Sequence, residues 1–274
     1  MKSAVTICLV PEARQGPFVF HDGLAAGCGA AAELGFDAVE VFPASAADLP
    51  LEQLRGLLAA HGLVLAAVGT GAGWVKHGLH VCHADAEIRR QASAFIGAIV
   101  DLAGQFGAPA IIGSMQGRSD ATVPREAALD HLAAALHELG TRAAAHGQVL
   151  LYEPLNRYET NLFNRQAEAA AWLRGRGIRH VKLLCDLFHM NIEEPDMAAA
   201  LVSCGDLVGH VHWADSNRRA VGLGHTDVAP VVAALESIGY RGFLSAEVFP
   251  LPTLHEAARQ SLASFHQHVR HIAT

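Results

Sequence analysis

Eight short apolar runs recur along the chain, and segments with the spacing of helices lie between them. The runs occupy residues 3–10, 38–43, 64–70, 108–114, 149–154, 181–186, 208–215 and 243–249. Two of the intervening segments, 85–107 and 124–147, are rich in Ala and Leu at helical period, and the second ends at a glycine suited to a helix C-terminus. Because strands that alternate with helices form parallel sheets, the pattern predicts an α/β fold.

The number of units selects among the α/β folds. Eight strand-helix units in 274 residues favour a (β/α)8 TIM barrel over an open doubly wound sheet, for which about six strands would be usual. The composition, 51% hydrophobic and 17% charged, suits helices that cover a strongly apolar parallel sheet. No Pro/Ser-rich linker divides the chain, so we expect one domain over residues 1–274.

Polar residues stand at the ends of the last four runs. Glu153, Asp186, His212 and Glu247 are separated by 33, 26 and 35 residues, each close to one strand-helix unit. Taken alone, each would more often cap the next helix or pair with a neighbour. Because the carboxyl ends of barrel strands share one rim, four such residues on consecutive strands are expected to converge.

This combination of side chains predicts a metal site. Three carboxylates cannot all stay ionised in a partly dry pocket unless a cation compensates them. Three carboxylate oxygens and one imidazole suit one divalent ion, with Mn2+ as the first expectation and Mg2+ or Co2+ as alternatives. Open coordination positions would accept substrate oxygens.

Charge and the first residues argue against several partners. The formal net charge is −7 and no dense Lys/Arg block is present, which predicts no nucleic-acid partner. The first apolar run stops at Pro11, Glu12 and Arg14, too short for a bilayer span or a signal peptide, so we expect no membrane partner and a cytoplasmic protein. Five scattered cysteines without a C-x-x-C pair are expected to be reduced thiols.

Four segments resemble a known family. "YEPLNRYETNL" (152–162), "CDLFHMNIEE" (185–194), "GHVHWADSNRRAVGLGHTD" (209–227) and "AEVF" (246–249) resemble, in order, the active-site segments of the xylose isomerase-like barrel superfamily. Within it they are most similar to the ketose 3-epimerases of the D-tagatose/D-psicose group. The similarity covers the second half of the chain closely.

The resemblance implies roles for individual residues. It implies metal ligation by Glu153, Asp186, His212 and Glu247, with Glu153 and Glu247 doubling as acid and base. It also implies that Glu159, His189 and Arg218 hold the carbonyl end of a small-molecule sugar, and that the chain forms a homodimer or homotetramer. Each of two of these residues has an alternative role. His189 could instead hold the Asp186 carboxylate in place, and Arg218 could form a surface salt bridge.

The predicted activity is epimerisation at C3 of a free ketose through an enediolate, with the paired glutamates moving the proton. An aldose-ketose, hydroxypyruvate-type or inosose/keto-sugar isomerase is the alternative on the same site, and a sugar-binding barrel is the alternative without catalysis. Endonuclease IV shares the barrel, but it needs a DNA-binding surface that this acidic chain does not predict.

Two segments after strands look long, residues 70–84 and 114–123. The first carries His77, His80 and His83 at helical spacing. A second metal site there is one interpretation, and a loop or helix surface is the preferred one. Trp74 either covers the apolar face of the substrate or packs the loop.

Overall fold

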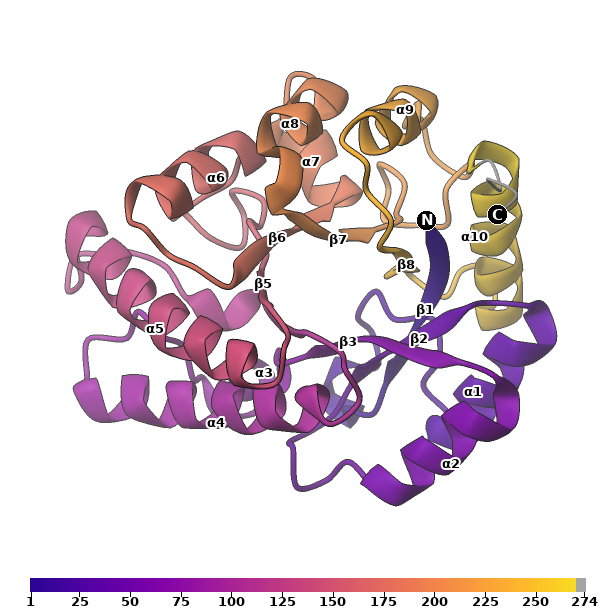
Figure 1. The fold of residues 1–274 in the computed structure, drawn as a ribbon, viewed down its shortest axis with the longest axis horizontal. Helices are drawn as coiled ribbons and strands as arrows, with labels where there is room; N and C mark the ends of the chain where they lie inside the picture. The colour runs from indigo at the N-terminus through magenta and orange to yellow at the C-terminus, as the bar shows by residue number, and fades with distance from the viewer. Residues whose placement is uncertain (270–274) are drawn as a thin grey trace.

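The computed structural model describes residues 1–269 and shows eight parallel strands that close into a barrel in sequence order (Figure 1). The ring is closed because β1 pairs with both β2 and β8. The predicted (β/α)8 TIM barrel is therefore confirmed. The strands are β1 (Lys2–Cys8), β2 (Ala38–Phe42), β3 (Val64–Gly69), β4 (Ala110–Ile112), β5 (Leu150–Tyr152), β6 (Val181–Asp186), β7 (Val208–His212) and β8 (Phe243–Ala246).

Helices connect the strands, and the longer ones surround the ring (Figure 1). The α-helices are α1 (Leu24–Leu34), α2 (Leu51–His61), α3 (Ala72–His77), α4 (Ala86–Gly104), α5 (Arg125–Ala145), α6 (Gln166–Gly175), α7 (Leu187–Glu193), α8 (Met197–Cys204), α9 (Ala229–Ser237) and α10 (Leu254–His268). The 3-10 turns are η1 (Pro11–Ala13), η2 (Ser114–Gln116) and η3 (Gly205–Leu207).

Each predicted run overlaps one strand, but only the sixth has the predicted bounds. The others are shorter, and β7 and β8 each stop three residues before the predicted end. There the backbone leaves the sheet: the Asp215 N–H donates to the Arg219 carbonyl at 2.9 Å, and the Phe249 N–H to the Arg218 carbonyl at 2.8 Å. Apolar residues past the strand ends therefore build loops around the carboxyl rim, the end of the barrel where the strands finish.

Apolar side chains form part of the inside of the barrel below this rim. Ala67, Ile111, Leu151 and Leu184 form one buried cluster. Leu184 lies two residues before the end of β6, on the same face of the strand as Asp186. The inward residues of β6 thus change from apolar to acidic at the carboxyl rim, which is where a barrel of this type carries its active site.

The two segments predicted as long loops are partly ordered into short helices. Residues 70–84 contain α3, and residues 114–123 begin with η2. Both follow strands and so lie at the carboxyl rim, in the position expected for segments that line a site.

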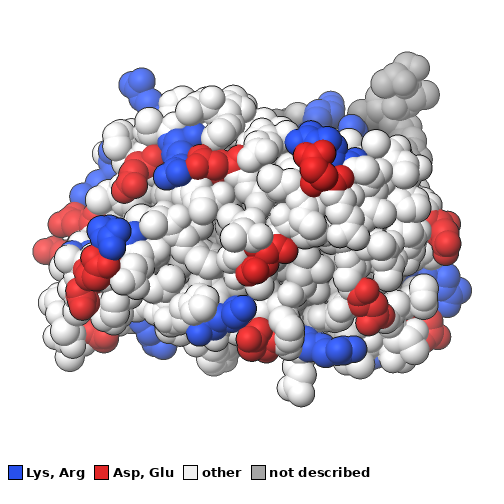
Figure 2. Space-filling view, turned by 90° about the horizontal axis from the view of Figure 1, so that it is seen from below, with Lys and Arg blue, Asp and Glu red and all other residues white. Residues whose placement is uncertain are grey.

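Figure 2 shows one face of the molecule, on which basic and acidic side chains are interspersed rather than gathered into a patch of one sign. Within residues 1–269, no helix combines the length and the apolar character that crossing a membrane requires.

Two helical glycines provide a test of how tightly α5 packs on the barrel. Gly56 in α2 has open space where a Cβ would lie, whereas a Cβ on Gly140 in α5 would lie 2.9 Å from the Arg179 carbonyl oxygen. We expect Gly56→Ala to raise the free energy of unfolding by about 0.5–1 kcal/mol, because Ala favours the helix. Gly140→Ala should lower it by about 1–3 kcal/mol through overpacking. Chemical denaturation measures both, and equal stabilisation at the two sites would contradict the packing.

Candidate active site

The four strand-end residues meet at the carboxyl rim. Asp186 and His212 are the last residues of β6 and β7, and Glu153 and Glu247 directly follow β5 and β8. All four are buried. Ligand atoms of Glu153, Asp186 and His212 lie within 4.8 Å of one another, and Glu247 Oε2 lies 3.4 Å from His212 Nδ1. The structure thus brings together all four residues singled out in the sequence.

His212 lies at the centre of this group. Its Nδ1 is 3.3 Å from Asp186 Oδ2, 3.4 Å from Glu247 Oε2 and 3.6 Å from Glu153 Oε1. Burial would lower the pKa of His212, but the charges of Glu247 and Glu40 outweigh burial and raise that pKa well above its ordinary value. An imidazolium here offsets part of the surrounding negative charge.

The three carboxylates differ in pKa although they share one site. Burial raises the pKa of Glu153 well above its ordinary value, and the charges of Glu247 and Asp186 add to this effect. Burial also disfavours ionised Asp186, but interaction with His189, a hydrogen bond with His212 and the positive charge of Arg218 hold its pKa below the usual range. The site therefore lacks the positive charge needed to ionise all three groups with ease.

Glu153 Oε1 and His189 Nε2 are buried polar atoms beside this group that have no hydrogen-bond partner. They are 3.8 Å apart, and His189 Nε2 is 3.7 Å from Asp186 Oδ2. Buried polar atoms without partners point to a missing ligand. Because the surrounding donors are carboxylate oxygens and one imidazole nitrogen, the residues fit a hard divalent metal ion together with a polar substrate.

Two further buried residues, Glu40 and His210, lie on the side of His212 that faces away from the other carboxylates. Glu40 Oε1 is 3.0 Å from His212 Nε2, and Glu40 Oε2 is 2.7 Å from His210 Nε2. Burial would raise the pKa of Glu40, but His212 and His210 hold it below its ordinary range, so the carboxylate accepts both hydrogen bonds. Neither Glu40 nor His210 was predicted, although an acid inside the apolar run 38–43 was a signal.

Asn156 fixes the orientation of His189. Its backbone N–H donates to His189 Nδ1 at 3.3 Å, and its side-chain Nδ2 is 2.8 Å from the same atom. Since Nδ1 accepts, the proton of neutral His189 is on Nε2, which faces Glu153 and Asp186. The predicted substrate residue thus presents an N–H donor to the site.

Arg218 reaches the same centre from the loop after β7. Its Nη2 donates to Glu247 Oε2 at 2.8 Å and lies 3.6 Å from Asp186 Oδ2, and its guanidinium covers the Phe188 ring at 4.8 Å. The side chain is largely buried, so Arg218 is not part of a surface salt bridge. Its backbone has a φ of 57°, in the left-handed region that non-glycine residues rarely occupy.

The loop that carries Arg218 folds around the carboxylate of Asp215. This side chain accepts hydrogen bonds of 2.7–3.0 Å from the backbone N–H groups of Ser216, Gly222, Gly224 and Thr226. Such a ring of donors lowers the pKa of Asp215 to about 2, although burial acts in the opposite direction. Asp215, which was not predicted, thereby holds Arg218 at the rim.

Glu159 lies on the loop after β5 and is half exposed. Its Oε1 accepts from Asn156 Nδ2 at 3.1 Å and is 3.7 Å from Arg218 Nη1. The loop is anchored to α7 by Arg157, whose Nε and Nη2 each lie 2.9 Å from an oxygen of Glu193. All three residues expected to hold a sugar therefore border the same centre.

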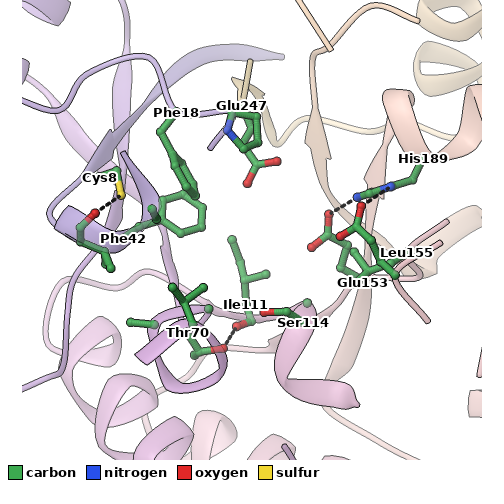
Figure 3. A pocket seen from close by; sticks show the side chains of 18 of the residues that line it. Cys8, Phe18, Phe42, Thr70, Ile111, Ser114, Glu153, Leu155, His189 and Glu247 are labelled. Carbon is green, nitrogen blue, oxygen red and sulfur yellow. Dashed lines mark hydrogen bonds and ion pairs between the residues drawn. The ribbon is translucent and has the colours of Figure 1, made fainter. Parts of the chain in front are cut away.

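These groups form one side of a cavity of about 180 Å3. Figure 3 shows Glu153 and His189 facing Phe18 and Phe42 across it, with Glu247 between the two sides. One side of the cavity is thus polar and charged and the other is aromatic and apolar, which is the composition of a site for a small polar molecule.

Comparison with known proteins identifies the family. The family model for the xylose isomerase-like TIM barrel matches residues 28–267. A D-psicose 3-epimerase from Enterocloster bolteae is 34% identical over 225 residues, which cover 79% of this chain and 73% of the relative. The chain belongs to the xylose isomerase-like TIM barrel family. This confirms the resemblance to ketose 3-epimerases and places the protein among isomerase-class enzymes.

Other members of this family extend the comparison. A 3-dehydro-D-guloside 4-epimerase from Escherichia coli is 39% identical over 105 residues, covering 38% of this chain and 40% of that protein. A solved D-psicose 3-epimerase from Clostridium cellulolyticum H10, crystallised with D-tagatose, superposes with a TM-score of 0.80 at 22% identity, covering 98% of this chain and 99% of that one. The superposition on this solved structure shows that the two proteins have the same fold.

In this member of the xylose isomerase-like barrels, the histidines of residues 70–84 lie apart from the centre. His77 packs against Phe95, and the His80 and His83 rings are 5.1 Å apart. Within the described part of the chain, the groups of three residues able to hold a metal ion do not include these histidines. Trp74 is 44% exposed, and its neighbour Val75 lines the cavity instead.

The role of Asp215 can be measured through stability. Asp215→Asn should lower the free energy of unfolding at pH 7 by about 1–3 kcal/mol, because a charged acceptor is lost from buried donors. The folded pKa of Asp215, about 2, is below its unfolded value of about 3.9. Its stabilisation is therefore complete above the unfolded pKa and is lost as pH falls through the folded one.

Urea denaturation from pH 7 to pH 3 should show the difference between Asp215→Asn and wild type shrinking below about pH 4. Asp227→Asn is the matched control: Asp227 is exposed and accepts a hydrogen bond from the Ala229 N–H, and the Asn side chain keeps an oxygen that can accept the same bond. Equal stability of Asp215→Asn and wild type at pH 7 would contradict the role given to Asp215.

Proposed function

We propose that the protein is a divalent-metal-dependent ketose 3-epimerase that inverts C3 of a free ketose. The observation that carries the proposal is that Glu153 and Glu247 come from different strands, both line the cavity and both lie within 3.6 Å of His212 Nδ1. Inversion at a carbon needs two groups that exchange protons with its two faces, and paired carboxylates beside one centre supply them.

In this proposal Glu153, Asp186, His212 and Glu247 hold the metal ion. Mn2+ is the ion we propose, and Mg2+ or Co2+ would satisfy the same donors. When bound, the ion would supply the positive charge that stabilises the negative charge developing on the carbonyl oxygen. The unpaired Glu153 Oε1 and the raised pKa of Glu153 support a missing cation here.

The glutamates move the proton. One of Glu153 and Glu247 removes the proton from C3, beside the ketone, and leaves an enediolate of the sugar. The other returns a proton to the opposite face of C3, so the configuration inverts. For the reverse reaction the two residues exchange roles.

His189, Arg218 and Glu159 orient the sugar in this scheme. His189 Nε2–H and the Arg218 guanidinium donate hydrogen bonds to the oxygens at the carbonyl end, where negative charge develops. Glu159 accepts a hydrogen bond from a terminal hydroxyl. The half-exposed position of Glu159 and the buried positions of His189 and Arg218 support this division.

The cavity favours a free sugar over a sugar phosphate. Among the described residues that line it, Arg218 is the one Lys or Arg, and its guanidinium already bonds Glu247. The opposite side is formed by apolar groups such as Phe18 and Phe42. A phosphate that lay against this side would have no cationic side chain beside it among the described lining residues.

A 4-epimerase of a 3-keto-glycoside is a second candidate, because the E. coli relative is named for that reaction and matches 105 residues. It would use the same paired acids on C4, the carbon beside the C3 ketone. Aldose-ketose isomerisation and binding without turnover are the remaining alternatives for the same site.

The test incubates the protein with Mn2+ and a panel of substrates: fructose, tagatose, psicose, sorbose, ribulose, keto-inositols and 3-keto-glycosides. We expect NMR to show a ketose inverted at C3, and we expect EDTA to abolish and Mn2+ to restore turnover. Glu247→Gln should lower turnover by about 10²–10⁴-fold, whereas Glu168→Gln, on the exposed face of α6, should match wild type. Conversion of only the keto-inositols or keto-glycosides, or full turnover after verified metal removal, would overturn the assignment.

A further inference from the structure

Glu40 is a fully buried carboxylate that the proposed reaction does not use. It lies in the middle of β2, and its exposed fraction is 0%. A charged group at such a position is costly unless hydrogen bonds satisfy it. Both oxygens are satisfied by histidines of β7, Oε1 by His212 and Oε2 by His210.

These two hydrogen bonds decide which nitrogen of His212 faces the acidic residues. Glu40 accepts a hydrogen bond from the Nε2–H of His212 at 3.0 Å. The imidazole is therefore held with Nδ1 toward the carboxylates of Glu153, Asp186 and Glu247, at 3.3–3.6 Å. A metal ion can bind Nδ1 only when the remaining proton of the ring is on Nε2. The contact with Glu40 therefore favours the tautomer that can act as a ligand.

His210 completes the arrangement from the other side of Glu40. It is two residues before His212 on the same face of β7, and its Nε2 lies 2.7 Å from Glu40 Oε2. This second hydrogen bond fixes the Glu40 carboxylate in the orientation in which Oε1 accepts from His212. His210 also lines a separate cavity of about 550 Å3 at the amino end of the barrel, the end where the strands begin.

We propose that Glu40 and His210 are positioning residues that fix the tautomer and orientation of His212 and so set the metal affinity of the site. This inference rests on the proposed function, because it requires that His212 be a metal ligand. Carboxylates that receive the second N–H of a ligand histidine typically change metal affinity by about 10–100-fold when they are mutated.

A purely structural role for the pair would give a different result. In that case the two hydrogen bonds would only satisfy buried polar atoms, and their loss would reduce stability without changing the tautomer of His212. Metal affinity and the protonation of individual ring nitrogens therefore separate the two roles better than stability does.

The experiment uses the full chain and five proteins: wild type, Glu40→Gln, His210→Gln, His210→Leu and Lys182→Met. Gln at 210 keeps an N–H donor for Glu40, whereas Leu removes it. Lys182→Met is the matched control, because Lys182 lines the same amino-end cavity without a hydrogen bond or ion pair to Glu40. Circular dichroism establishes that each variant is folded.

Mn2+ affinity is measured by calorimetry, and histidine tautomers by long-range 1H–15N NMR on metal-free protein at alkaline pH, where His212 is neutral. We expect about 10–100-fold weaker Mn2+ binding for Glu40→Gln and His210→Leu, and affinity within about 3-fold of wild type for His210→Gln and Lys182→Met. His212 should be the Nε2–H tautomer in wild type and a mixture of tautomers in Glu40→Gln.

Wild-type Mn2+ affinity and an unchanged His212 tautomer in folded Glu40→Gln would overturn the inference and leave the proposed function intact. If Glu40→Gln does not fold, the two His210 variants decide, and equal affinity in His210→Leu and His210→Gln would overturn it. Absence of Mn2+ binding by wild type would instead overturn the metal-dependent function, and this inference with it.

Discussion

Electrostatic repulsion among three buried carboxylates is the constraint on which the rest of this site depends. Glu153, Asp186 and Glu247 lie around one imidazole nitrogen at the carboxyl rim, and the pKa of Glu153 is raised because burial and its acidic neighbours disfavour its charge. Arg218 supplies a permanent positive charge, whereas His212 supplies one only while it is protonated, and protonated Nδ1 cannot bind a metal ion. A divalent ion is the additional charge that would let the carboxylates serve as ligands and as proton carriers.

The groups around this centre are held by partners farther out. Glu40 holds His212 and Asn156 holds His189, each through a hydrogen bond to the ring nitrogen that faces away from the centre. The Asp215 carboxylate accepts hydrogen bonds from backbone N–H groups of the loop that carries Arg218. Positioning of this kind matters for proton transfer, because a displacement of about 1 Å can cost a large factor in rate.

The sequence was sufficient to predict the parts that depend on local pattern. Alternating runs predicted the barrel, and position at the end of a strand predicted that Glu153, Asp186, His212 and Glu247 would meet, because parallel strands finish at a common rim. Glu40 and Asp215 could not be placed in the same way. Glu40 contacts His212 across 172 positions of sequence, and that contact depends on how the ring closes; the bonds of Asp215 depend on the path of a loop. The ends of β7 and β8 were missed because apolar residues continue into loops that cover the rim.

The central claim is that two carboxylates exchange protons with the two faces of one carbon. The most direct measurement is epimerisation of a free ketose by the Mn2+-loaded protein in D2O, followed by NMR of the product. The account predicts deuterium at C3 of the C3-inverted ketose, because the proton removed by one glutamate is replaced from a second glutamate that equilibrates with solvent. An inverted product that retains the substrate hydrogen at C3, or label confined to C1 or C2, would contradict it.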